Sequence, residues 1–399
     1  MRSHYLLLPA SLALLGSAPV FSQQDPLTLS AGYSVQTDSN LFRLPSSANL
    51  QNTIGKSSAA ETIGVTTVGL GFNTRQSLQT LALNLNLVDY SYQNFSYLSF
   101  TANNYNASWE WAVTPKVTGK FSTDRKETLN SFTDSTNVKQ RNLRLDTTTR
   151  FDASYALDGP WRLIAGASTT RQENQAGLVT GSDFTTNAVD GGVRYQFATG
   201  SSLSYLMRTN KGSYLNRAVP NTGAFDDQYT QLDNDLRLRW LMGTGSTVNA
   251  NLTHINRTHP RYGQRDYNGF NFGAGVDWAL TGKTSLSTSI SHTLDAYAAS
   301  NSNYSSTDKI SVSAGWQISP KVGLRLKNDW AQRSYLGSPS TTASSNRQDI
   351  TRDTTLSVNW QAHEQLALSA SLQQSSRGVN QANLDYDSTM LFFTAQLTY

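Results

Sequence analysis

The sequence predicts an all-β protein whose strands close into an antiparallel, up-and-down transmembrane β-barrel of about 18 strands. Three observations support this prediction: apolar side chains recur with a period of two, short links alternate with long ones, and an aromatic residue recurs near the end of every second strand. Composition agrees, because 38% of the 399 residues are hydrophobic while 10% are aromatic. A mean hydropathy of −0.44 is too polar for a bundle of membrane-spanning helices.

The alternation is clearest in residues 143–157, where apolar or neutral side chains occupy every odd position. Arg144, Asp146, Arg150 and Asp152 occupy even positions. Residues 232–240 and 322–330 alternate in the same way. Successive side chains of a strand point to opposite faces, so one face would meet lipid and the other water. Because Lys or Arg facing the bilayer midplane costs about 2–4 kcal/mol, charged side chains are predicted on the enclosed face.

A barrel of about 18 strands can enclose an aqueous lumen. By this parity rule, the polar residues predicted to line it are Arg144, Asp146, Arg150, Asp152, Arg194, Arg208, Asp233, Asp235, Arg237, Arg239, Asp277, Arg325, Lys327 and Asp329. Carboxylates accept and guanidinium groups donate hydrogen bonds, so a lumen of mixed sign suits a sugar chain. The alternative for each residue is an ion pair with a neighbouring strand that only stiffens the wall.

Links between the segments predict the topology. Turn-forming triplets such as Asp158-Gly159-Pro160 and Ser319-Pro320-Lys321 alternate with polar links of about seven to twenty residues, including 211–227 and 296–305. Short periplasmic turns and long extracellular loops are typical of outer-membrane barrels. No proline falls inside a predicted strand. The first hairpin is the weakest part, because Ile63 and Val65 have the opposite parity from Val68 and Leu70.

Nine aromatic residues recur near the ends of the descending strands and predict a periplasmic aromatic girdle. They are Phe72, Trp111, Tyr155, Tyr195, Trp240, Trp278, Trp316, Trp360 and Tyr399. The alternative is a hairpin repeat in a soluble β-protein, which does not need equivalent aromatics at one height. Residues 391–399 alternate and end on an aromatic residue, which resembles the segment that barrel assembly machinery recognises.

The N-terminus predicts a cleaved signal peptide at residues 1–22, followed by one barrel domain at 23–399. Arg2 and His4 precede an apolar run, and Val20 and Ser22 supply the small residues before the cut. The run is short for a membrane-spanning helix, which needs about 20 apolar residues. The absence of cysteine excludes disulfides, thiolate metal sites and a lipidated cysteine anchor.

The first strand runs into Asp38-Ser-Asn-Leu-Phe-Arg-Leu-Pro45, and Asp89-Tyr90, Asn94-Phe95-Ser96, residues 107–111 and residues 158–162 follow. These segments resemble the EpsL-type outer-membrane proteins encoded with exosortase-associated (PEP-CTERM) exopolysaccharide biosynthesis loci. The resemblance covers the mature chain, and its motifs are mostly structural. It implies an outer-membrane barrel that assists polysaccharide export, and it carries no catalytic residues.

No residue constellation indicates an enzyme, a metal site or a cofactor. His254 and His292 fall on the lipid-facing parity, where a phospholipase dyad could lie, but no serine is paired with them on that face. The net charge of +4 is spread along the chain, which gives no basic patch for nucleic acid. Loop tyrosines at 214, 262, 304 and 335 could stack on sugars or pack within their own loops.

The sequence therefore predicts a bacterial outer-membrane barrel whose polar lumen passes exopolysaccharide. The expected partners are outer-membrane lipid, the polysaccharide, other components of its secretion, and the barrel assembly machinery acting on the last strand. Two alternatives stay open: a general diffusion porin, and a surface barrel that anchors finished polysaccharide like a lectin.

Overall fold

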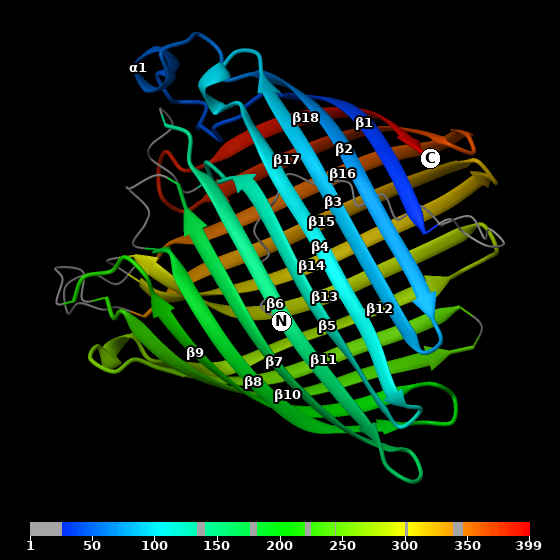
Figure 1. Cartoon of the computed structure of the whole chain (residues 1–399). Coiled ribbons are helices and arrows are strands. Elements are labelled where there is room, and N and C mark those ends of the chain that lie inside the picture. The colour runs from blue at the N-terminus through cyan, green and yellow to red at the C-terminus, as the bar shows by residue number, and fades with distance from the viewer. Residues whose placement is uncertain are drawn as a thin grey trace.

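The computed structural model describes residues 26–133, 140–175, 182–219, 225–243, 245–299, 302–337 and 346–399. Within these ranges each strand pairs antiparallel with its neighbours in sequence, and the first strand also pairs with the last. The eighteen strands therefore form one closed sheet (Figure 1). The prediction of a closed 18-stranded barrel is confirmed, whereas the predicted signal peptide lies outside the described residues.

The strands are β1 (Leu27–Asp38), β2 (Glu61–Gln76), β3 (Gln79–Tyr92), β4 (Phe100–Thr114), β5 (Val117–Leu129), β6 (Leu143–Ala156), β7 (Trp161–Asn174), β8 (Phe184–Gln196), β9 (Ser202–Tyr214), β10 (Gln228–Met242), β11 (Ser246–Thr258), β12 (Tyr267–Ala279), β13 (Thr284–Ala299), β14 (Ser302–Ser319), β15 (Val322–Leu336), β16 (Gln348–His363), β17 (Leu366–Val379) and β18 (Tyr386–Thr398). Links hold the short helical segments α1 (Leu50–Ile54), η1 (Ser96–Leu98) and η3 (Gly263–Arg265). Among the described residues, no helix has the length and apolar character needed to cross a membrane.

Large apolar side chains cover the outside of the barrel. Leu326, Leu356, Leu372 and Phe393 lie on different strands, and each exposes more than two fifths of its surface. The intervening residues of the same strands point inward, because side chains alternate across a sheet. An apolar surface that encircles a closed sheet is the surface that membrane hydrocarbon covers.

Charged residues break the parity rule near the long links. Arg171 and Glu173 pair at 2.7 Å on β7, and they share the outward parity of Trp161 and Leu163. Asp308 likewise shares the parity of the exposed Ile310 on β14. The expectation that charges always avoid the outer face is therefore wrong at these strand ends. The cost of an outward charge falls to about 0–1 kcal/mol near the membrane boundary, so the ends tolerate it.

One predicted long link is largely strand. Residues 296–305 were expected to form a loop, but β13 continues to Ala299 and β14 begins at Ser302. The register shifts between Ala296 and Ala299, which marks a β-bulge. The segment contains neither glycine nor proline, so nothing in it ends the two strands.

We expect arginine on the outer face to destabilise the barrel far more than arginine on the inner face. Leu356 is exposed near the middle of β16, whereas Thr355 has the opposite parity. Leu356→Arg should lower the free energy of unfolding by about 2–4 kcal/mol, because the charge meets hydrocarbon. Thr355→Arg should cost much less. Urea unfolding in lipid vesicles measures both, and equal losses would contradict the assignment of the two faces.

Candidate functional site: the charged lumen and its narrowed mouth

The inner wall carries a network of ion pairs centred on Asp190 of β8. Its carboxylate accepts two hydrogen bonds from Arg150 at 3.0 Å, and Arg208 donates to the same group at 2.9 and 3.1 Å. Only 2% of the Asp190 side chain is exposed. Arg150 also pairs with Asp152 on its own strand. A buried carboxylate is thus neutralised by arginines from β6 and β9.

A glycine makes this network possible. Arg150 and Asp190 belong to β6 and β8, so the contact must cross β7, where Gly166 faces the same side. A Cβ atom at Gly166 would lie 2.5 Å from Arg150 Nη2 and 2.9 Å from Asp190 Oδ2. Any other residue there would have to displace the ion pair, and the strand therefore carries no side chain at the crossing point.

Most of the other predicted lumen residues are paired along the wall. Arg144 donates to Asp146 at 2.8 Å, and Arg237 pairs with Asp235. Asp233 accepts hydrogen bonds from Asn210 and Gln231, and Asp329 pairs with Lys327 and Lys309. Arg194 donates to Ser204. Within the described residues, Arg239, Asp277 and Arg325 have inward parity and make no ion pair. Several of these residues therefore do contact a neighbouring strand, as the alternative reading expected. That the predicted residues as a group line a lumen stays a prediction.

The sequence reasoning missed Asp190, Lys120, Glu110 and Arg162. Asp190 has the same parity as Arg194, four residues later. Val189 and Val193 precede these two residues directly, and both are exposed on the opposite face. Lys120 and Glu110 are cross-strand partners that pair at 3.1 Å. Arg162 lies between the exposed Trp161 and Leu163. The parity rule could have found all four residues if it had been applied to these shorter stretches.

A cavity of about 580 Å³ opens along this wall. Among its lining residues are Arg75, Glu110, Lys120, Arg150, Asp190 and Arg194. Apolar residues, among them Ile164 and Leu206, also line it. The cavity therefore presents charged groups beside apolar surface.

We call the end of the barrel that carries the long links the mouth. The link from β1 to β2 folds inward there and covers one side of it. Phe42 and Phe95 are each 1% exposed, and their rings meet edge to face at 4.6 Å. Phe132, in the link from β5 to β6, contacts Phe42 at 4.8 Å. These rings pack on Ile63 and Val65 of β2, which explains the reversed parity of the first hairpin. Those two side chains point inward because the link supplies them with an apolar partner. We call this group the aromatic cap.

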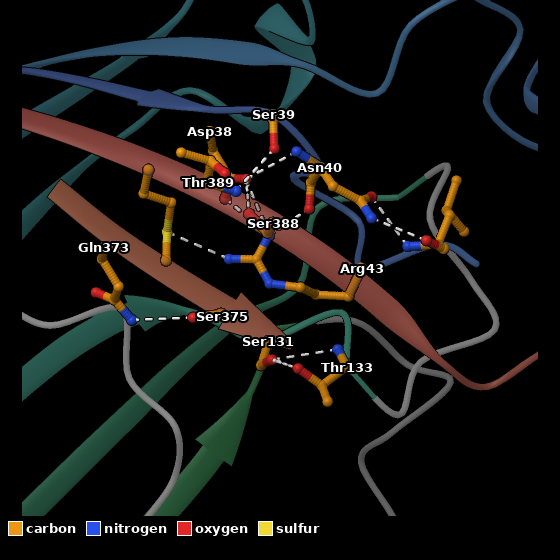
Figure 2. A network of polar contacts seen from close by, with 12 residues as sticks. Asp38, Ser39, Asn40, Arg43, Ser131, Thr133, Gln373, Ser375, Ser388 and Thr389 are labelled. Atoms are coloured by element: carbon orange, nitrogen blue, oxygen red, sulfur yellow. Dashed lines mark hydrogen bonds and ion pairs between the residues drawn. The ribbon is translucent and has the colours of Figure 1, made fainter. Parts of the chain in front are cut away.

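Polar contacts hold the aromatic cap in place. Arg43 Nη1 donates to Asp38 Oδ2 at 2.8 Å, and Ser388 of β18 donates to the same carboxylate at 2.6 Å. Figure 2 shows the Arg43 side chain pointing back to Asp38. The buried carboxylate of Glu61 accepts backbone N–H groups of Thr62 and of residues 93–95. Arg43 adopts a left-handed φ of 55°, a conformation that these contacts stabilise.

A second cluster covers nearly the opposite side of the mouth, between β9 and β12. The Arg257 guanidinium lies 3.9 Å from the Tyr229 ring centroid, and Arg265 lies 3.9 Å from that of Phe225. Such cation–π contacts strengthen when they are removed from water, and both arginines are 5% exposed. A Cβ at Gly212 would lie 2.0 Å from the Tyr229 ring, so only glycine lets the ring rest on β9.

Asp226 ties the second cluster to the link after β11. Its carboxylate accepts the backbone N–H groups of Arg261 at 2.6 Å and Tyr262 at 3.2 Å. Burial alone would raise the pKa of Asp226, but these N–H donors outweigh burial and hold its pKa below the ordinary value. The carboxylate therefore stays charged and keeps the two loops together.

Three of the four tyrosines predicted in loops lie in strands instead, since β9 ends at Tyr214, Tyr304 belongs to β14 and Tyr335 belongs to β15. Their side chains pack against the protein. Tyr335 is 2% exposed and donates to Asp349 at 3.1 Å, and Tyr304 stacks on Tyr267 at 4.9 Å. Tyr214 lies beneath the Arg217 guanidinium. Sugar stacking on these three rings would require these contacts at the strand ends to break.

The nine predicted girdle residues lie at the ends of alternate strands next to the short links, on the outward parity. Tyr155, Trp240, Trp278, Trp316, Trp360 and Tyr399 are exposed. Trp111 instead lies over Gly119 and stacks on Phe151 at 5.7 Å. Tyr195 contacts Trp161 and Phe197 edge to face. The residues are thus at the predicted end of the barrel, and their role at the membrane boundary stays a prediction.

The two outer histidines pack on aromatic rings of β12. His292 Nδ1 lies 2.7 Å from Asp308 Oδ1, and its ring stacks on Phe272. His254 packs on Phe270. In the described part of the chain, no three His, Cys, Asp or Glu side chains are grouped to hold a metal ion. The sequence reasoning did not foresee the partnership with Asp308, which depends on the register of β13 and β14.

The comparisons with known proteins agree with this geometry. A family model described as "Putative beta-barrel porin 2" matches residues 254–399. Pseudomonas aeruginosa OpdK, solved with vanillate, superposes with a TM-score of 0.52 at 13% identity, over 94% of this chain and 99% of that one. A BenF-like porin from Pseudomonas fluorescens Pf-5 gives a TM-score of 0.54 at 12% identity, over 94% and 98% of the two chains.

Pseudomonas aeruginosa OccK2 (OpdF), solved with glucuronate, gives a TM-score of 0.53 at 12% identity and covers 94% of this chain and 98% of that one. No curated protein matches the chain by sequence. At these identities the structures share the barrel architecture. Together with the apolar outer surface, that architecture makes the chain an outer-membrane β-barrel of porin-like form.

Proposed function

We propose that the protein is a passage for small polar solutes across the bacterial outer membrane. The observation that supports this proposal is the charged wall around Asp190, which faces a cavity of about 580 Å³ inside a closed sheet. A wall built only for stiffness has no need of buried charges, because apolar packing usually gives at least equal stability. Structural neighbours solved with vanillate and glucuronate fit such a role.

The aromatic cap and the second cluster favour small solutes over a polymer. They fill two nearly opposite sides of the mouth with packed, buried side chains. A sugar chain threading the barrel would have to pass between them. Small molecules need less room, and this proposal therefore replaces polymer passage as the first choice.

Assistance in exopolysaccharide export is the second candidate, and one observation favours it. Two of the segments that resemble the EpsL-type proteins meet in space, since Phe42 from the first contacts Phe95 from the second. The aromatic cap therefore carries part of the resemblance, whereas residues 158–162 lie at the short link from β6 to β7. Polysaccharide, other secretion components and the barrel assembly machinery acting on β18 are the partners proposed for this role. Anchoring of finished polymer at the outer surface is its variant.

Bilayer recordings test the first proposal. Refolded full-length protein should produce stepwise currents in planar membranes, and vesicles that contain it should swell in galactose but not in a long oligosaccharide. Heat-unfolded protein is the control. A silent bilayer together with unswollen vesicles would overturn solute passage. Deleting the gene then tests the second candidate, because loss of secreted polymer with normal solute uptake would favour export, and polymer that no longer adheres would favour anchoring.

A further inference from the structure

Three arginines form one row across the inner wall near the short links. Arg162 of β7 is the direct cross-strand partner of Arg194 of β8. Arg194 is opposite Ser204 of β9, and Ser204 is opposite Arg237 of β10. Adjacent strands lie about 4.8 Å apart, so Arg162 and Arg194 are direct neighbours and Arg237 lies two strands beyond Arg194. Like charges directly opposite each other destabilise a sheet.

Carboxylates do not balance this row as they do a row closer to the long links. Four residues along each strand, the inner wall carries Lys120 opposite Asp152, and Arg208 between Asp190 and Asp233. In the arginine row, only Arg237 has a carboxylate partner, Asp235 on its own strand. Arg194 donates to a hydroxyl, and Arg162 makes no ion pair within the described residues. Within the described residues, Arg162 and Arg194 therefore have no carboxylate partner, whereas the charges of the other row are paired.

Two arginines of the row line the cavity, and Arg162 shares their inward parity on β7. Arg194 and Arg237 both line the cavity that Lys120 and Arg150 also line. The outward positions beside the row hold Trp161, Val193 and Leu236, which expose apolar surface on the other face. The arginines therefore point to the aqueous side. A guanidinium group presents paired N–H donors that match the two oxygens of a carboxylate or phosphate group.

We propose that Arg162, Arg194 and Arg237 form an anion subsite that attracts small solutes bearing a carboxylate or phosphate group. This inference rests on the proposed solute passage and names its substrate class. The subsite accepts an oxyanion from the cavity, and the arginines on either side share the charge. A neutral sugar of equal size gains none of this attraction.

Ion selectivity tests the subsite. In planar membranes under a KCl gradient, the reversal potential should show preference for chloride over potassium. One charge about 10 Å from an ion in water changes its occupancy about twofold, so R194Q and R162Q should each lower that preference about twofold. R325Q is the matched control, because Arg325 also has inward parity and makes no ion pair within the described residues but lies on β15. Its effect should be clearly smaller.

Solute uptake gives the second measurement. Galacturonate should enter vesicles faster than galactose through the wild-type protein, and R194Q should reduce this difference. Inorganic phosphate as a competitor tells whether the subsite also takes phosphate. Currents that prefer potassium, or an R325Q effect as large as that of R194Q, would overturn the subsite while solute passage stands. No current from any variant would overturn the passage itself.

Discussion

Replacing Asp190 with alanine is expected to lower the free energy of unfolding by about 3–5 kcal/mol. The side chain is almost fully buried and neutralises Arg150 and Arg208 together. Without it, two guanidinium groups, themselves 20% and 13% exposed, face each other across the site with no shared anion. Breaking a buried ion pair costs more than the pair contributes, because the remaining charges lose their compensation. Urea unfolding in lipid vesicles measures the loss.

Asp152→Ala is the matched control for this prediction. Asp152 pairs with the same Arg150, but its side chain is 42% exposed and binds no second arginine in the described residues. Exposed ion pairs contribute about 0–1 kcal/mol, so the loss should be small. If the two variants lose equal stability, the Asp190 network does not hold the wall together.

Replacing Phe42 with alanine should release the aromatic cap and increase the single-channel conductance. Truncating a buried phenylalanine costs about 3–5 kcal/mol, and Phe42 lies between the rings of Phe95 and Phe132. The lost packing energy stabilises a link rather than the sheet. The barrel should therefore stay closed while residues 39–60 become sensitive to protease. Bilayer currents and limited proteolysis together measure the effect.

Leu215→Ala is the control, since Leu215 lies in a long link at the same end of the barrel and is 41% exposed. It should leave conductance and protease resistance unchanged. An F42A channel with wild-type conductance and a protease-sensitive link would show that the cap does not narrow the passage. Wild-type behaviour in both measurements would show that Phe42 does not hold the link.

The barrel could be predicted from the sequence because lipid and water impose one rule on every strand. Residues 143–157 and 322–330 show the rule plainly, and their strands lie within a few residues of the expected bounds. The rule fails where the environment changes. Arg171 and Glu173 lie at the end of β7 next to a long link, where an outward charge costs little, and Ile63 and Val65 meet the aromatic cap instead of water.

The candidate site was predictable as a set of inward residues but not as a network. The pairing of Arg150 with Asp190 depends on contact between strands that are not neighbours, and Gly166 permits that contact by lacking a side chain. The arginine row depends on the register of four strands, which alternation alone does not determine. Apolar residues of inward parity beside a link containing Phe42 were the available signal for the aromatic cap.

The pairing of β1 with β18 imposes an order on biogenesis. Ser34 and Thr394 meet through a 2.9 Å hydroxyl contact, although 360 positions separate them along the polypeptide. Contacts between such distant residues are slow to form, because a very long loop must close first. Until β1 and β18 pair, the sheet has two unpaired edge strands, and such edges can pair with other chains and aggregate. The sheet is therefore closed only once β18 has paired with β1.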